Sequence, residues 1–296
     1  MYLKRKADAY LNAWKSDPNR SPLIIKGPRQ VGKTETIDYF AAHNYRSVVE
    51  INFVEEPKYR AITADGYGAN TIVRNISLID PAKKFIPGDT LIFFDEIQAH
   101  PDIATALKFF KIDGKYDVIC SGSMLGISYK QIESNSVGYK TDYEMRSLDF
   151  EEFLWARGYD EAVIESMFTH LCDATPFSEV EMNVFSTAFM DYCVLGGMPA
   201  VVASHIRTST FEGTLQLQRQ LILDYQEDIR KYAQGPDQAR ILNVFNHIPV
   251  QLAKENKKFQ ISKVASGARF KDYRGCVEWL ETSGMVNILS LIHISE

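Results

Sequence analysis

The sequence lacks the cysteine and histidine patterns of a zinc-binding or disulfide-linked protein. Its four cysteines include no C-x-x-C pair, and its six histidines are scattered along the chain. Zinc sites and disulfide frameworks need cysteines or histidines at characteristic spacings. We therefore predict four reduced thiols in a reducing compartment, and no metal site made of protein ligands alone.

Long apolar segments are also missing. No stretch approaches the ~18 unbroken apolar residues of a membrane-spanning helix. The first residues, MYLKRKADAYLNAWK, lack the apolar run of a secretory signal. Both absences argue against a membrane partner and predict a cytoplasmic protein.

Positive charge is not in excess either, because the formal net charge of the 296 residues is −5. A protein whose whole surface coats nucleic acid would be basic, so only a local basic patch is left open. The composition that remains is ordinary for a globular protein, with 45% apolar and 24% charged residues. The length allows one large core or two to three smaller ones.

Apolar runs alternate with helical patterns in the first half of the chain. Helices are predicted at residues 1–15, Lys33–His43 and Pro101–Lys111, and strands at Leu23–Lys26, Ser47–Phe53, Thr90–Phe94, Tyr116–Cys120 and Tyr143–Met145. Nearly continuous apolar strands that alternate with helices are typical of a parallel sheet covered on both faces. The first half is therefore expected to have an α/β fold.

The second half shows helical patterns without a strand signature. Asp149 and Glu152 fit a capping box at the start of a helix, and helical patterns continue to about Tyr232 with a break at Gly196–Gly197. Gly235–Pro236 then marks a boundary.

Three short helices are expected after this boundary, the second of them capped by Ser262. Their outline is that of a helix-turn-helix or winged-helix module. The chain is therefore divided into an N-terminal helix (1–20), a sheet core (21–155), a helical region (156–235) and a winged-helix-like module (236–296).

The strongest motif is GPRQVGKT, which matches the Walker A pattern G-x-x-x-x-G-K-[ST]. Its glycines let the backbone curl so that N–H groups converge on a phosphate, and the following helix adds its positive end. Lys33 would supply a charge to the β- and γ-phosphates, and the Thr34 hydroxyl would bind Mg²⁺. The residues predicted to bind ATP are Gly27, Pro28, Arg29, Gln30, Val31, Gly32, Lys33, Thr34 and Glu35.

The second motif is Leu91-Ile-Phe-Phe-Asp95-Glu96, an apolar strand that ends in two acids, as in Walker B. Ligands of open α/β sheets bind at the carboxyl ends of the strands. Asp95 is predicted to hold Mg²⁺, mostly through water, and Glu96 to act as the general base that polarises the attacking water. Alone, such a strand could simply run into a solvated turn; after a Walker A loop, the catalytic interpretation is favoured.

Other residues could sense the γ-phosphate or stabilise its transition state. Ser121 and Ser123 follow a predicted strand, and Ser123 is the preferred sensor; the alternative is a turn that caps its own backbone. Arg146 is a candidate catalytic cation, as is Arg29 within the loop, against the alternative of an ordinary surface arginine.

One segment is basic within this acidic chain. Residues 254–274 contain seven basic and two acidic residues, which gives a net charge of +5. On a helix-turn-helix outline this segment could contact the DNA backbone. The alternative is a solvated face of a module used only for packing.

These motifs resemble those of prokaryotic AAA-superfamily ATP-binding proteins with a C-terminal domain of unknown function. The matching stretches are Lys26–Thr34, Leu91–Gln98, Ser121–Gly126, Leu148–Leu154, Leu195–Val202, Asp224–Ala233 and Ile248–Val264. The resemblance implies an AAA-like P-loop NTPase core, an all-α region, a winged-helix-like module and ATPase activity. It also implies a further domain, similar to restriction-endonuclease-like folds, that this chain is too short to contain.

The resemblance is expected to stop after Val286. Ser290–Glu296, SLIHISE, is similar to translated sequencing-adapter sequence, which predicts a truncated chain. The alternative is a native wing strand, because Leu289, Leu291 and Ile292 are apolar.

The sequence therefore predicts a Mg²⁺-dependent ATPase whose turnover moves its helical and winged-helix parts. A slow-hydrolysing regulatory switch or a DNA-binding adaptor is the alternative, and a homo-oligomer is left open. A GTPase is disfavoured because no N-K-x-D motif occurs. A small-molecule kinase is disfavoured because Asp95-Glu96 suits activation of water.

Overall fold

The computed structural model describes residues 1–123, 138–233, 235–255, 258–265, 267 and 269–289. It divides the chain into two compact units, Met1–Leu217 and Gln218–Glu296. The predicted adapter-like segment, 290–296, lies outside the described residues.

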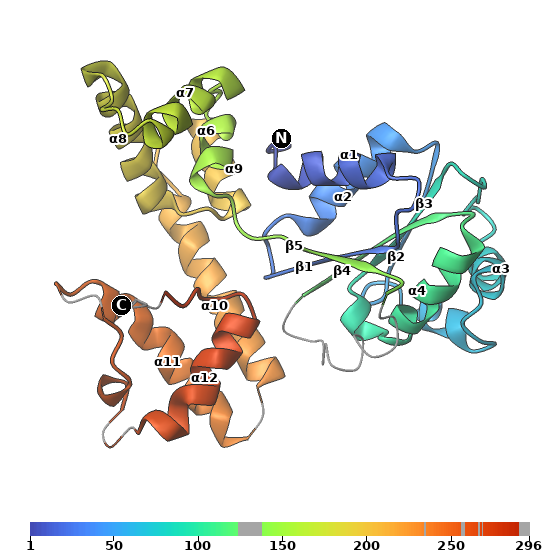
Figure 1. Ribbon diagram of the computed structural model, residues 1–296. Coiled ribbons are helices and arrows are strands. Elements are labelled where there is room, and N and C mark those ends of the chain that lie inside the picture. The colour runs from blue at the N-terminus through green and yellow to red at the C-terminus, as the bar shows by residue number, and fades with distance from the viewer. Residues whose placement is uncertain (124–137, 234, 256–257, 266, 268, 290–296) are drawn as a thin grey trace, which may run out of the picture. The chain divides into compact units, whose positions relative to one another are not determined.

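A parallel sheet forms the centre of the first unit (Figure 1). Its strands are β1 (Leu23–Gly27), β2 (Ser47–Asn52), β3 (Thr90–Asp95), β4 (Asp117–Ser123) and β5 (Thr141–Glu144). They lie in the order β2-β3-β4-β1-β5, and every neighbouring pair is parallel. The predicted α/β fold with a parallel sheet is confirmed.

Helices cover both faces of this sheet. The helices of this part are α1 (Lys6–Ser16), α2 (Lys33–Asn44), α3 (Ala69–Ile79) and α4 (Asp102–Asp113), with short 3₁₀ helices η1 (Pro57–Thr63) and η2 (Ile97–Ala99). The sequence patterns predicted α1, α2 and α4 but not α3. The segment of α3, ANTIVRNISLI, is rich in β-branched residues and asparagine, which have low helix propensity, so its helix depends on packing.

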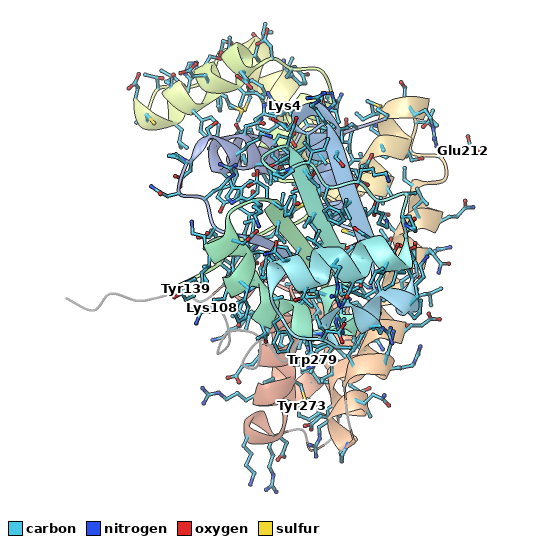
Figure 2. All side chains as sticks on the ribbon, turned by 90° about the vertical axis from the view of Figure 1, so that its right-hand side faces the viewer. Lys4, Lys108, Tyr139, Glu212, Tyr273 and Trp279 are labelled. Carbon is cyan, nitrogen blue, oxygen red and sulfur yellow. The ribbon has the colours of Figure 1, made fainter. Side chains whose placement is uncertain are left out.

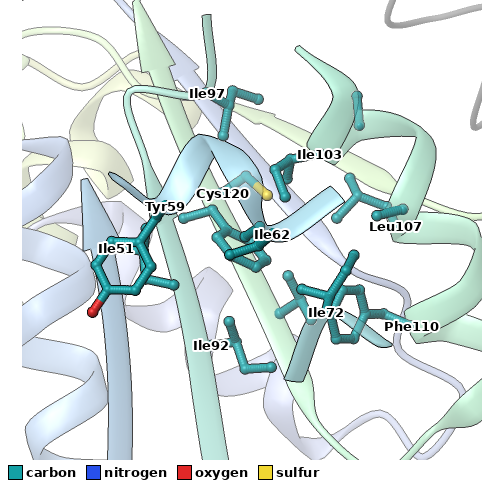
Figure 3. Packing of buried hydrophobic residues seen from close by; sticks show 14 of the residues in the cluster. Ile51, Tyr59, Ile62, Ile72, Ile92, Ile97, Ile103, Leu107, Phe110 and Cys120 are labelled. Carbon is teal, nitrogen blue, oxygen red and sulfur yellow. The ribbon is translucent and has the colours of Figure 1, made fainter. Parts of the chain in front are cut away.

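The strands bury apolar residues in two separate cores. On β3, Ile92 and Phe94 enter the core beneath α3 and α4, whereas Leu91 and Phe93 enter the core beneath α1 and α2. Figure 3 shows the first of these cores, in which Ile92 packs with residues of η1, α3 and α4. Because β3 is buried along its whole length, its polar chemistry is confined to its end, at Asp95.

Four helices follow the sheet: α6 (Phe150–Ala156), α7 (Glu161–Cys172), α8 (Glu179–Leu195) and α9 (Pro199–Thr208). The predicted capping box is present, because the Glu152 amide donates to Asp149 Oδ1 at 2.9 Å and the Asp149 amide donates to Glu152 Oε2 at 3.2 Å. The predicted break at Gly196–Gly197 is confirmed, and the chain also leaves the helical conformation between α7 and α8 and after α9.

The second unit is a small helical assembly. It contains most of α10 (Thr214–Tyr232), then α11 (Pro236–Leu252), the 3₁₀ helix η3 (Ile261–Lys263) and α12 (Phe270–Thr282). Its core joins residues of all three α-helices: Ile229, Ala233, Ile241, Val244, Val264, Tyr273, Cys276 and Leu280. Figure 2 shows Tyr273 and Trp279 on α12.

The winged-helix prediction is not confirmed. The segment expected as a helix capped by Ser262 is a single 3₁₀ turn that contains Ser262, with Gln260 at its N-cap. Helical elements account for the regular structure of the described part of this unit, and Met285–Leu289 forms no strand.

Among the described residues of the whole chain, no helix has both the length and the apolar character needed to cross a membrane.

Candidate nucleotide-binding site

The phosphate loop, Gly27–Thr34, connects β1 to α2. A Cβ on Gly27 would lie 2.1 Å from the carbonyl oxygen of Met145, so only glycine fits there. Gln30 and Gly32 have φ angles of 62° and 91°, in the left-handed region. Left-handed residues in such a loop turn successive N–H groups toward one concavity, where an anion can bind at the start of a helix.

Lys33 is buried within this loop. Its Nζ donates to the carbonyl oxygens of Gly27 at 3.0 Å and Pro28 at 2.7 Å. Burial lowers the pKa of Lys33 to about 8, while the carboxylates of Glu96 and Asp95 oppose the shift. The ammonium group is therefore still mainly charged at neutral pH, in the position expected of a phosphate-binding lysine.

The carboxylate of Asp95 accepts hydrogen bonds from polar groups at or near the ends of three strands and from α2. Its Oδ2 accepts from Thr34 Oγ1 at 3.2 Å and from Asn52 Nδ2 at 3.3 Å. Its Oδ1 accepts from the Ser121 hydroxyl and from the Glu96 amide, the latter at 2.9 Å. Only 3% of Asp95 is exposed, so these bonds fix its orientation.

Thr34 and Asp95 fit the requirements of Mg²⁺. Neighbouring oxygens of an octahedral Mg²⁺ shell lie about 2.9 Å apart, because each oxygen is 2.0–2.1 Å from the ion. The hydroxyl and carboxylate oxygens of this pair are 3.2 Å apart, close to that spacing. Both are the hard oxygen ligands that Mg²⁺ prefers.

Glu96 occupies a strained position beside this pair. Its φ of 54° is left-handed, which costs a non-glycine residue about 1–3 kcal/mol. Its half-buried carboxylate accepts a hydrogen bond from the Gln98 amide group. Backbone strain of this kind is concentrated at functional sites, because surrounding contacts must hold it.

Residues 19–154, which include all the groups just described, match the family profile of the AAA domain. This part of the chain is an AAA domain. Residues 186–295 match a second profile, a domain of unknown function (DUF8612). That match runs past Val286, where the resemblance was expected to stop, so a domain of unknown function lies within the chain itself.

Solved structures show only distant likeness. The AMPPCP-bound DnaA from Aquifex aeolicus has a TM-score of 0.40 and 13% identity, covering 95% of this chain and 87% of that one. Domain III of the Thermotoga maritima replication initiation protein DnaA has a TM-score of 0.40 and 13% identity, covering 74% and 94%. C. elegans PCH-2 has a TM-score of 0.33 and 11% identity, covering 59% of this chain and 48% of PCH-2. No curated protein is significantly similar in sequence.

The two predicted sensors of the AAA domain occupy different places on β4. Ser121 contacts Asp95, although Ser123 was preferred from the sequence. Ser123 is buried at the end of the strand and pairs in register with Gly27, the first residue of the phosphate loop. Both positions suit a sensor, and the preference for Ser123 stays a prediction.

For the other residues predicted to bind or act on ATP, the described part of the chain shows no side-chain hydrogen bond to Asp95 or Thr34. Arg146 follows β5, and its exposed side chain pairs with Glu144 at 2.8 Å. Arg29 is half-buried in the loop, where its charge lowers the pKa of Lys33 further. Glu35 is exposed in the first turn of α2. A catalytic role for Arg146 stays a prediction.

Sequence reasoning missed Asn52. It ends β2, the neighbour of β3, and its amide reaches Asp95. The signal was available in principle, since a polar residue ends an apolar strand, but its use required knowing that β2 and β3 are adjacent.

The predicted DNA-binding residues belong to the second unit. The cations of residues 254–274 that the structure describes are exposed: Lys254, Lys258, Lys263, Arg269, Lys271 and Arg274. Arg274 pairs with Glu278 at 2.9 Å along α12. Lys257 lies outside the described residues.

Proposed function

We propose that the AAA domain binds ATP together with Mg²⁺ and hydrolyses it to ADP and phosphate, in the service of a conformational, partner-related or DNA-related task. The observation that carries this proposal is the placement of Asp95. Its buried carboxylate contacts Thr34 of the phosphate loop and directly precedes the strained Glu96.

In this proposal the residues of the site have different roles, which follow from their chemical groups. The amides of the phosphate loop and the ammonium group of Lys33 bind the phosphates, and Thr34 and Asp95 hold Mg²⁺. When bound, Mg²⁺ neutralises charge on the phosphate oxygens.

Glu96 orients a water molecule and accepts its proton. The water oxygen forms a bond to the γ-phosphorus, and the bond between this phosphorus and the β–γ bridging oxygen breaks. The electron pair of that bond stays on ADP, and the proton resides on the Glu96 carboxylate.

Steady-state ATP hydrolysis by the wild type and by Glu96→Gln tests the assignment. Removing the general base is expected to lower kcat by about 10²–10⁴-fold, whereas the affinity for ATP changes little, because phosphate binding rests on other groups. Glu212→Gln is a matched control, since Glu212 is an exposed carboxylate on a loop (Figure 2).

The runner-up function predicts a different outcome. A regulatory switch or DNA-binding adaptor would bind ATP tightly and hydrolyse it slowly. Equal, near-zero turnover of wild type and Glu96→Gln, with ATP bound by both, would favour the switch over the ATPase.

A further inference from the structure

Arg5, which directly precedes α1, is almost completely buried, with 4% exposure. Its Nη1 donates to the carbonyl oxygen of Val31 at 2.7 Å, and its Nη2 donates to that of Arg146 at 2.5 Å. Buried arginines are rare unless they are paired, and this one reaches two distant backbone carbonyls. One of them belongs to the phosphate loop.

The contact with Val31 bears on the next amide of the loop. In a trans peptide, the carbonyl and the following N–H point in opposite directions. No cis peptide occurs among the described residues. Because the Val31 carbonyl faces Arg5, the Gly32 N–H points away from Arg5. Gly32 itself has the left-handed φ of 91°, so this peptide is a fixed part of the anion-binding concavity.

A carboxylate holds the guanidinium in place. Glu152 Oε1 lies 3.2 Å from Arg5 Nε, and both side chains are nearly inaccessible, at 6% and 5% exposure. The same Oε1 accepts from the Lys6 amide at 2.7 Å, and Oε2 accepts from the Asp149 amide at 3.2 Å. The backbone amides at the starts of α1 and α6 therefore fix the carboxylate, which forms an ion pair with Arg5 although Nε makes no hydrogen bond to any described residue.

We propose that Arg5 is a positioning residue for the phosphate loop. Its guanidinium holds the Val31 carbonyl so that the Gly32 N–H stays turned toward the phosphates of ATP. Arg5 touches no phosphate itself and acts through Gly32. This inference rests on the proposed binding of ATP, and it adds a long-range tie that no Walker motif contains.

Arg5 also neutralises Glu152, which affects the choice of variant. Arg5→Ala would leave a buried carboxylate without its partner, which destabilises folding. The double variant Arg5→Met with Glu152→Gln removes both charges and keeps similar volumes, and the glutamine oxygen still accepts from a backbone amide. The double variant avoids the unpaired buried carboxylate of Arg5→Ala, but the glutamine NH₂ group would face one of the two backbone N–H groups, so a moderate loss of stability is expected.

A second arginine–carboxylate pair supplies the control. Arg157 Nη1 contacts Asp191 Oδ2 at 2.5 Å between the end of α6 and α8. Arg157→Met with Asp191→Asn removes a more exposed arginine–carboxylate pair, with side-chain exposures of 27% and 23%, and neither partner lies in the phosphate loop.

Isothermal titration with MgATP and with ADP measures the effect. In Arg5→Met/Glu152→Gln the dissociation constants of both nucleotides are expected to rise about 10- to 100-fold, the range of a charge-assisted hydrogen bond. The control is expected to stay within about twofold of wild type. The Gly32 bond is made to bound ATP before chemistry, so KM should rise with the dissociation constant while kcat at saturating ATP changes little.

Melting of the nucleotide-free variants separates positioning from general destabilisation. Similar melting temperatures of the two double variants, with weak ATP binding in only the first, would support the role of Arg5. Equal ATP affinity of wild type and Arg5→Met/Glu152→Gln would overturn this role alone. Absence of ATP binding by the wild type would overturn both this inference and the proposed function.

Discussion

The parallel sheet and the helical second unit bury apolar residues in different ways. Each residue of β3 is buried, and alternate side chains enter cores on opposite faces of the sheet. In the second unit, each α-helix contributes to one core and leaves its other face to solvent. A helix can therefore carry polar groups along its whole length, whereas a doubly covered strand carries them only at its ends.

Because of this difference, the polar side chains of the sheet meet at the carboxyl ends of its strands. The ends of β2, β3 and β4 bring Asn52, Asp95 and Ser121 into hydrogen-bonding contact. The exposed cations of the second unit, such as Lys271 and Arg274, lie in solvent along a helix. Converging polar groups can select and activate a small ligand, whereas a solvated row of charges favours a large polyanion with little specificity.

The largest expected effects concern the separate cores. Phe94→Ala should lower the free energy of unfolding of the sheet by about 3–5 kcal/mol, and Leu280→Ala should lower that of the helical unit by about 2–5 kcal/mol. Leu289→Ala, at a position 97% exposed, should change stability by less than about 0.5 kcal/mol. Amide hydrogen exchange reports each unit separately. Equal loosening of β3 amides by Phe94→Ala and Leu280→Ala would contradict the division into two units.

The next largest effect is expected for ATP binding, and it compares a buried lysine of the phosphate site with a lysine exposed to solvent. Lys33→Ala should weaken ATP binding by about 100-fold or more, because it removes a buried ammonium group from the phosphate site. Lys84→Ala, at an exposed lysine, should leave the affinity unchanged. Undiminished ATP affinity of Lys33→Ala, measured by calorimetric titration, would show that the phosphates bind elsewhere.

The lowered pKa of Lys33 predicts an opposite pH dependence of binding and stability. ATP affinity should be close to its maximum at pH 7 and fall as the pH passes the pKa near 8, by up to about tenfold per pH unit above it, as the ammonium loses its proton. Between pH 8 and 10.5 the unfolded state binds more protons at this lysine than the folded state does. Its contribution to the stability of the nucleotide-free protein should therefore increase with pH in this range. Affinity and denaturant unfolding measured from pH 7 to 10 check both slopes, and a flat affinity would contradict the role of the ammonium.

The smallest effect is expected for DNA. The segment 254–274 should bind duplex DNA weakly at low salt, and Lys271→Ala should reduce the slope of log affinity against log salt by about one. Lys84→Ala serves again as the control. Fluorescence anisotropy at several salt concentrations measures the slope, and no binding at low salt would remove this role from the second unit.

The sequence predicted those parts of the site that are formed by adjacent residues. It did not predict contacts between residues that are far apart in the sequence. The phosphate loop could be predicted from GPRQVGKT alone. The conformations of its glycines and the start of the following helix depend on residues that are adjacent in the sequence. Glu152 was identified from its spacing to Asp149, but its partner Arg5 lies 147 positions earlier, and no periodicity relates two such distant residues. Asn52 likewise depended on the order of strands in the sheet.

The C-terminal unit shows the converse problem. Its first and last helices were predicted close to their observed positions, but the middle one is only a 3₁₀ turn. A row of short helices is common to many modules, and the wing that would distinguish a winged helix is not found among the described residues. Helical periodicity locates the buried face of each helix and leaves the topology open.

The hydrogen bonds of Asp95 also bear on the order in which metal and nucleotide load. Thr34, Asn52, Ser121 and the Glu96 amide already occupy the carboxylate. An isolated Mg²⁺ ion would have to exchange part of its hydration shell for oxygens that are engaged with each other, and Mg²⁺ gives up water reluctantly. Phosphate oxygens delivered with the ion would offset that loss, so the proposed site is expected to take up the preformed Mg²⁺–ATP complex rather than Mg²⁺ alone.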